Sequence, residues 1–438
     1  MTARRALGLV VALVVALAAA PSAGAQAKAP SVTRTQLPNG LTVLVRENPT
    51  APVVAISLMT RMGTRGETRA GAGIGNFVQL MLVRGTTTKN GVEIIEAAER
   101  MGGTLDAYAD VDYAEIAGTA LSRHWAEMLG LIADVARNAT IPEATAEAVK
   151  DFLLKQIRNR GEKPADAGSD TFGRLLFGTH PYGWNPLGYR DSVEKMTRET
   201  LVAQYRRFYV PGGMVIAVSG RVKGPEVLAE VTRLFGSMPE GYAPAVPAPS
   251  PPALEASREV IEVPGAQAQI LMGAFAPPAT HPDFAAVKVL ATVLGGGLSG
   301  RFFSELRDKQ GLAYTTGATY RARIDRSAFI ALIGTGPENA EKSEQALRGE
   351  LERVQREPVS AEELRVAKAY LLGNLAMDRR TNARQAWYLA SYEIAGVGHE
   401  FLDLYEANVK AVTVADLQRV ARRYLPILRT VVVRPPAR

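Results

Sequence analysis

Cysteine is absent from the 438-residue sequence, and histidine is scarce. The absence of cysteine excludes disulfides, thiol nucleophiles and metal sites with cysteine ligands. Histidine occurs only four times, and no two copies stand at the spacing of a local metal-binding motif; the positions are His124, His180, His281 and His399. A metal site built from neighbouring histidines is therefore excluded as well.

Long apolar runs are missing except near the N-terminus. Arg4 and Arg5 precede the apolar run ALGLVVALVVALAAA (6–20), and small residues follow in PSAGAQ. A positive region, a short apolar run and an Ala-x-Ala pattern, in this order, predict a secretory signal peptide over residues 1–25. A spanning helix needs about 20 apolar residues, which favours the signal peptide over the alternative, a retained membrane anchor.

A strong charge of one sign is lacking too. The net charge is +7, and Arg4 and Arg5 contribute two of these charges, so the chain after the signal peptide carries +5 (7 − 2). Lysine and arginine are spread along the chain without a basic cluster. This distribution does not favour a nucleic acid as a partner.

The chain contains two halves with the same order of expected elements. Strand–helix–helix–strand–helix–helix–helix–strand occurs twice, about 210 residues apart. Between the repeats, residues 241–253 (GYAPAVPAPSPPA) are rich in proline and alanine and uncharged, which is typical of a stiff extended linker. We therefore expect an α+β protein with two homologous domains, residues 26–240 and 254–438.

The stretch GIGNFVQLMLVRGT (73–86) is expected to form a short helix that begins after glycines and ends at Gly85. Asn76, Gln79 and Leu80 occupy positions i, i+3 and i+4 of this stretch. Side chains at that spacing share one face of a helix. If they were His, Glu and His, the face would carry the H-x-x-E-H motif of a zinc peptidase.

Five segments resemble the pitrilysin/insulinase-type zinc peptidases, in the short two-domain branch that also holds mitochondrial processing peptidase and the core proteins of the bc1 complex. Each segment is weakly specific alone, but their order and spacing are specific together, and the resemblance covers nearly all of the chain after the signal peptide. The segments are QLPNGLTVLVREN, GAGIGNFVQLMLVRGT, GGTLDAYADVDYAEI, FGTHPYGWNPLGYRDSVEKMTRETLVAQYRRFYVPGGMVIAVSG and LGGGLSGRFFSELRDKQGLAYTTGATY. The resemblance implies that each domain is an antiparallel-rich sheet packed against helices.

The sequence departs from the family at its zinc site. In active members two His of the motif and a later Glu bind zinc, and the Glu between the two His is the general base. The matching positions here are Asn76, Gln79, Leu80 and Gln156. Leucine offers no lone pair, neutral amides are poor zinc donors, and an amide cannot take a proton from water. We expect no metal in this chain and no peptidase activity from the chain alone.

The second half keeps a different pair from the family. In the family, the second domain supplies an Arg and a Tyr seven residues apart, which hold the substrate backbone. In this chain the segment SELRDKQGLAY has Arg307 and Tyr314 at that spacing. Arg donates to carbonyl or carboxylate groups, and a Tyr hydroxyl donates to an oxyanion. We interpret both as substrate-binding residues.

Bacterial relatives of this kind occur as two chains, one with the zinc motif and one with the Arg/Tyr pair. The resemblance therefore implies a zinc-less subunit of a periplasmic heterodimeric zinc endopeptidase, with zinc in a homologous partner that carries an intact H-x-x-E-H motif. Its substrates would be peptides or unfolded segments. The alternatives are a catalytically inactive peptide-binding or scaffold protein with a peptidase fold, as in the bc1 core proteins, and a separate hydrolase, for which no Ser/His/Asp arrangement is visible.

Other polar residues carry weaker signals. His180 in THPYG has no partner nearby in sequence and is interpreted as structural. Tyr108, Asp110 and Asp112 are candidates for the wall of a cavity. The glycine strings GAGIGN and LGGGLSGR lack the last Gly of a dinucleotide fingerprint and the Lys-Ser/Thr of a P-loop, so a nucleotide cofactor is not expected.

Overall fold

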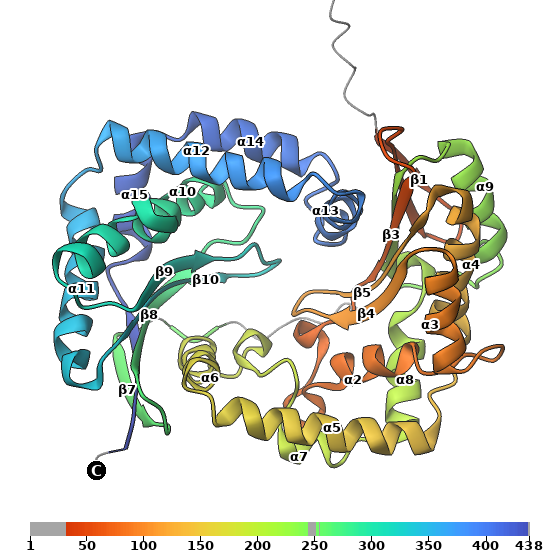
Figure 1. Ribbon diagram of the computed structural model, residues 1–438, viewed down its shortest axis with the longest axis horizontal. Helices are drawn as coiled ribbons and strands as arrows, with labels where there is room; N and C mark the ends of the chain where they lie inside the picture. Colours follow the sequence, from red (N-terminus) through yellow and green to blue (C-terminus); the bar gives the residue numbers. More distant parts are fainter. Residues whose placement is uncertain (1–31, 244–250, 254, 437–438) are drawn as a thin grey trace, which may run out of the picture. The chain divides into compact units, whose positions relative to one another are not determined.

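The computed structural model describes residues 32–243, 251–253 and 255–436 (Figure 1). The predicted signal peptide lies outside the described residues, and so do residues 244–250 of the predicted linker. Val32–Arg438 cluster as one compact unit. None of the helices in the described part of the chain combines the length and the apolarity that crossing a membrane requires.

Groups of strands and groups of helices follow one another along both halves of the chain. The strands are β1 (Val32–Gln36), β2 (Thr42–Glu47), β3 (Val53–Thr60), β4 (Thr104–Ala109), β5 (Ala114–Leu121), β6 (Met214–Gly220), β7 (Ser257–Glu262), β8 (Ala268–Ala276), β9 (Thr315–Tyr320), β10 (Ser327–Thr335) and β11 (Arg429–Arg434). The helices of the first half are α2 (Ile74–Leu82), α3 (Gly91–Arg100), α4 (Trp125–Asn138), α5 (Glu143–Gly161), α6 (Pro164–Phe177), α7 (Arg190–Val193), α8 (Arg198–Phe208) and α9 (Gly224–Phe235). Those of the second half are α10 (Phe284–Gly295), the π-helix η7 (Phe302–Lys309), α11 (Ala340–Arg356), α12 (Ala361–Asp378), α13 (Asn382–Ile394), α14 (Phe401–Ala411) and α15 (Val414–Tyr424). Single turns of 3₁₀-helix are η1 (Thr64–Gly66), η2 (Arg69–Gly71), η3 (Ser122–His124), η4 (Pro181–Gly183), η5 (Pro211–Gly213), η6 (Gly297–Ser299) and η8 (Pro337–Asn339).

The described strands form two sheets with the same topology. The first has the order β1-β2-β6-β3-β5-β4 and the second the order β7-β11-β8-β10-β9. In each sheet one pair is parallel, β2 with β6 and β7 with β11, and the other pairs are antiparallel. Apart from the extra edge strand β1, the sheets match strand for strand. This confirms the predicted α+β fold with two repeated, antiparallel-rich sheets packed against helices.

The central strands of the first sheet are covered on both faces. Successive side chains of a strand point to opposite faces, so Ile56 and Leu58 of β3 enter one apolar core, which also takes residues of α2, α4, α8 and α9. Ala55 and Met59 of the same strand enter a second core. A strand that is buried on both faces has a continuous apolar run rather than an alternating pattern. Strand β6 is such a strand, because all of its residues are buried.

Each sheet takes one covering helix from the other half of the chain. The second core on the first sheet is closed by α13, which supplies Ala386, Leu389 and Ala390. Conversely, α6 lies on the second sheet, where Phe172 packs with Leu271 of β8. Figure 1 shows α13 next to β3 and α6 next to β8, in agreement with the contacts between these elements. The two halves therefore exchange helices.

Several elements differ from the sequence-based expectation. The helix that was expected to end at Gly85 ends at Leu82, and the segment FFSELRDKQG forms a π-helix. Strands β4 and β9 and helices α6, α7, α9, α13 and α14 were not predicted. The limits of the two domains, 26–240 and 254–438, stay a prediction.

Candidate functional site

Helix α2 begins at a glycine and is capped by a buried carboxylate. Gly73 has a φ of 92°, and a Cβ there would lie 2.5 Å from the carbonyl oxygen of Leu187, so only glycine fits. The Glu67 side chain accepts hydrogen bonds of 2.8 Å from the backbone N–H groups of Gly73 and Gly75. These bonds satisfy two donors at the helix start and place a carboxylate at the positive end of the helix dipole.

Glu67 is expected to make the stability of the fold depend on pH. Burial raises its pKa from 4.5 to about 7, although the two backbone donors act in the opposite direction. Between these values the unfolded chain has lost the proton and the folded chain still holds it, so stability falls as pH rises from 4.5 to 7 and is level above that range. The contribution of one such group is a slope of up to about 1.4 kcal/mol per pH unit.

Glu67→Gln removes this titration, because an amide resembles the protonated acid at every pH. We expect chemical denaturation at a series of pH values to give the variant a flatter profile than the wild type between pH 4.5 and 7. Glu99→Gln, at an exposed glutamate of α3, is the matched control and should run parallel to the wild type. Parallel profiles for Glu67→Gln and the wild type would show that Glu67 does not titrate in this range.

The face of α2 that corresponds to the zinc motif is closed by packing. Gln79 has no exposed surface, and its Nε2 donates a hydrogen bond of 2.6 Å to the hydroxyl of Tyr209. Leu80 is half-buried against the core of the first half. Asn76 is half-buried, and its Nδ2 has no hydrogen-bond partner within the described ranges. This face is a polar and apolar contact surface.

Gln156 lies on the solvent-exposed side of α5, a helix that packs against α2. The residues at these four positions do not fit zinc: Leu80 has no donor atom, and Asn76, Gln79 and Gln156 offer only neutral amides, which are poor zinc ligands. Within residues 32–243, 251–253 and 255–436, no three His, Asp or Glu side chains gather closely enough to hold a metal ion.

Arg307 and Tyr314 are brought together and left exposed. Arg307 lies on the π-helix η7, where its guanidinium stands 4.9 Å from the ring centroid of Phe303. Its Nη1 donates a hydrogen bond of 3.3 Å to the carbonyl oxygen of Tyr314. Tyr314 precedes β9, and its own N–H donates to Gly334 of β10 over 2.8 Å. Its side chain is 60% exposed, and its hydroxyl has no hydrogen-bond partner in the part of the chain that the structure describes.

A half-buried charge cluster links the two halves. We define it as Arg65, Asp110, Asp112, Arg323 and Asp325. Arg323, in the β9–β10 connection, pairs with Asp110 and lies 3.8 Å from Asp112, both in the β4–β5 connection. Arg65 pairs with Asp325 over 2.6 Å. Burial raises the pKa of Asp112, whereas for Asp110 Arg323 outweighs burial and the pKa is lowered.

His180 and Tyr182 extend the cluster on the side of the first half. The hydroxyl of Tyr182 donates to Asp112 over 2.5 Å and accepts from the backbone N–H of Asp325 over 3.1 Å. His180 is buried and its Nδ1 accepts from the N–H of Tyr182, and burial lowers the pKa of its ring. These contacts support the structural interpretation of His180. Tyr108 lies apart, hydrogen-bonded to the buried Glu115.

Sequence reasoning named Asp110 and Asp112 without a role and missed Arg323. The only available signal was the pair of short charged connections, ADVDY and RARIDR, at the same place in the two repeats. Since their partners are more than 200 residues apart in sequence, no local pattern joins them.

Two family profiles match the chain in succession. Residues 42–176 match the family described as Insulinase (Peptidase family M16), and residues 195–371 match the one described as Peptidase M16 inactive domain.

Curated relatives cover nearly the whole chain. A protein of Mycobacterium tuberculosis (strain ATCC 25618 / H37Rv), named an uncharacterized zinc protease, is 30% identical over 412 residues, which are 92% of this chain and 93% of the relative. A protein of the same designation from Bacillus subtilis (strain 168) is 25% identical over 386 residues, 88% of this chain and 93% of the relative.

Solved structures agree in fold. A peptidase M16 inactive domain from Pseudomonas fluorescens superposes with a TM-score of 0.87 at 23% identity and covers 93% of this chain and 99% of that one. A protease from Helicobacter pylori gives 0.88 at 22% identity over 93% and 100%. The first half of the periplasmic protease PqqL from Escherichia coli gives 0.75 at 19% identity over 92% of each.

Proposed function

This chain belongs to the M16 (insulinase) family of peptidases, and we propose that it is the zinc-less subunit of a periplasmic heterodimeric zinc endopeptidase. Its partner would be a homologous chain with an intact H-x-x-E-H motif, which binds the zinc. Arg307 and Tyr314 would hold the substrate at the partner's site. The substrates would be peptides or unfolded segments of proteins, and this chain alone would not cleave them.

The observation that carries the proposal is the contrast between the two halves. On α2 the positions that would hold a metal carry no suitable donors, and Gln79 is locked against Tyr209. On the second half the Arg307 guanidinium is tied to the Tyr314 backbone, while the Tyr314 side chain stays exposed. Arg307 and Tyr314 are therefore fixed in position, and their donor groups remain open to solvent. This arrangement suits contact with a second molecule.

The chemistry of this pair fits substrate holding. An Arg guanidinium carries a fixed charge and five N–H donors, of which one is used on Tyr314. The Tyr hydroxyl can donate to a peptide carbonyl and, more strongly, to the oxyanion that forms as the carbonyl is attacked. Zinc in the partner would supply the activated water, and these two residues would orient the scissile peptide and stabilise its charge.

The location is part of the proposal. The predicted signal peptide supports export, and the solved neighbour PqqL is described as a periplasmic protease. Neither observation names the partner.

The proposal is tested by a tagged pull-down of this chain from native periplasm, with the recovered proteins identified by mass spectrometry. We expect a stoichiometric partner with an intact H-x-x-E-H motif. The recovered complex should cleave an unfolded reporter peptide, and the isolated chain with added zinc should not. Recovery of the chain alone, or with unrelated envelope proteins, would overturn the proposal.

A scaffold or peptide-binding role is the second candidate. The closed α2 face favours it, because Gln79 and Leu80 are placed for packing and leave no open site. A scaffold has no need of Arg307 and Tyr314. Under this alternative the chain would assemble with partners, and substitution of either residue would change no activity.

A further inference from the structure

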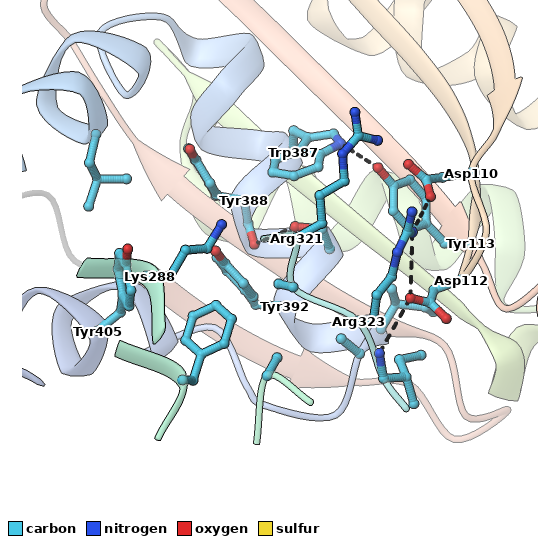
Figure 2. Close-up of a pocket in the computed structure, with 18 of the residues that line it drawn as sticks. Asp110, Asp112, Tyr113, Lys288, Arg321, Arg323, Trp387, Tyr388, Tyr392 and Tyr405 are labelled. Carbon is cyan, nitrogen blue, oxygen red and sulfur yellow. Dashed lines mark hydrogen bonds and ion pairs between the residues drawn. The ribbon is translucent and has the colours of Figure 1, made fainter. Parts of the chain in front are cut away.

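A cavity of about 540 Å³ lies apart from the Arg307–Tyr314 pair. It is bounded by α10, α12, α13 and α14 and by the β4–β5 and β9–β10 connections, and Figure 2 shows its lining. Much of the wall is aromatic, with Phe284, Trp387, Tyr388, Tyr392 and Tyr405. Sites for small organic ligands have this size and this predominantly apolar character, with a few polar groups that fix orientation.

Each carboxylate of the wall already faces an arginine. Asp110 and Asp112 face Arg323 within the charge cluster. Asp378 pairs with Arg384 over 2.7 Å and accepts a hydrogen bond of 2.6 Å from Tyr388. Each wall carboxylate is therefore engaged by an arginine of the chain itself.

Two cations of the wall are not neutralised. Within the described ranges, neither Lys288 nor Arg321 has a carboxylate at ion-pair distance. Lys288 reaches the carbonyl oxygen of Tyr320 and lies 5.9 Å from the ring centroid of Phe284. Figure 2 shows both cations on the wall with the aromatic side chains.

Lys288 stands in an environment that disfavours its charge. Burial, and then the positive charge of Arg321, lower its pKa to about 8. An unpaired ammonium against apolar surface costs free energy that a bound anion would offset. A carboxylate between Lys288 and Arg321 would relieve both the burial and the repulsion.

We propose that this cavity binds a carboxylate attached to a bulky apolar group, with the carboxylate at Lys288 and Arg321 and the apolar group against the aromatic wall. Two sources share this chemistry, a free small organic acid and the C-terminus of a peptide with a large apolar last residue. The inference does not rest on the proposed function, because neither Arg307 nor Tyr314 lines the cavity.

Titration calorimetry on the full chain after the signal peptide tests the site with phenylbutyrate and with phenylbutanol, which has the same apolar part and no charge. We expect the acid to bind and the alcohol to bind at least about 10-fold more weakly, since one lost charge-assisted contact costs on the order of 1.4 kcal/mol. Equal affinity for the two probes, or no binding of the acid, would overturn the proposal.

Variants assign the binding to the two cations. Lys288→Met and Arg321→Gln should each weaken phenylbutyrate about 10-fold. Arg326→Gln is the matched control, because Arg326 is exposed in the same β9–β10 connection and lies outside the cavity wall. If circular dichroism shows that Lys288→Met does not fold, the test of the site rests on Arg321→Gln, because Arg321 is exposed and its substitution should leave the fold intact. Unchanged affinity in Arg321→Gln would then overturn the site.

The two sources are separated with an acetylated tripeptide that ends in phenylalanine, prepared as the free acid and as the amide. Tighter binding of the peptide acid than of both its amide and phenylbutyrate identifies a peptide C-terminus as the occupant. Binding of phenylbutyrate alone identifies a free acid. Equal binding of peptide acid and peptide amide, together with no binding of phenylbutyrate, contradicts the carboxylate site.

Discussion

Replacing Tyr314 by phenylalanine is expected to lower kcat of the proposed two-chain complex about 100-fold, because loss of one donor to a developing oxyanion has an effect of this size. The ring stays, and with it the surface that is 60% exposed. KM should therefore change little, since the hydroxyl contributes more to the transition state than to the bound peptide. Steady-state cleavage of a fluorogenic unfolded peptide measures both constants.

Arg307→Ala is expected to lower kcat/KM by a similar factor, about 100-fold, with a larger share in KM, because it removes a donor that we propose to position the substrate backbone. It also removes the hydrogen bond that steadies the Tyr314 backbone. The double variant should lose less than the product of the two effects, since neighbouring residues that act together are not additive.

Two exposed residues serve as controls for this pair. Tyr370→Phe removes a hydroxyl from an exposed tyrosine of α12, and Lys309→Ala removes a cation from the same π-helix as Arg307. Both control variants should cleave at the wild-type rate, and all four should co-elute with the partner. If Tyr314→Phe and Arg307→Ala also cleave at the wild-type rate in an assembled complex, the shared-site proposal is wrong.

Replacing Arg323 by methionine is expected to lower the free energy of unfolding by about 3–5 kcal/mol, the range seen when one partner of a buried ion pair is removed. Arg323 is the cation that faces both Asp110 and Asp112, and burial already raises the pKa of Asp112. Without Arg323 two carboxylates would remain buried side by side. Chemical denaturation at pH 8 measures the loss.

The pH and a combined variant show whether the buried charge causes this loss. Protonation removes the carboxylate charge, so the difference between Arg323→Met and the wild type should be smaller at pH 5 than at pH 8. Adding Asp110→Asn and Asp112→Asn should recover much of the stability. Arg326→Met, in the same connection, is the control and should cost little. A pH-independent difference would attribute the loss to packing alone.

The repeated α+β fold was predictable because both halves carry the same order of local patterns. Asn39-Gly40, for example, is a local turn signal that predicts a hairpin, and β1 and β2 pair antiparallel around it. Helices α6 and α13 were missed. Their apolar residues, such as Phe172 and Leu389, pack on the sheet of the other half, so the order of elements within one repeat does not account for them.

The candidate site was predictable only where a motif is continuous in sequence. The motif SELRDKQGLAY predicts that Arg307 and Tyr314 act as a pair, and the two residues do contact each other. The charge cluster and the aromatic cavity were not predictable, because Asp112 and Arg323, or Lys288 and Trp387, come together only through the tertiary fold.

The exchange of α6 and α13 between the halves has a consequence for how this chain can be divided. A gene split between the repeats would yield two polypeptides. The first would contain α6 but lack α13, and the second would contain α13 but lack α6, so one face of each sheet would lose its covering helix. The exposed apolar faces would make each product aggregate alone and would drive the two to reassemble. The two repeats share a sheet topology but are therefore expected to fold only as a pair.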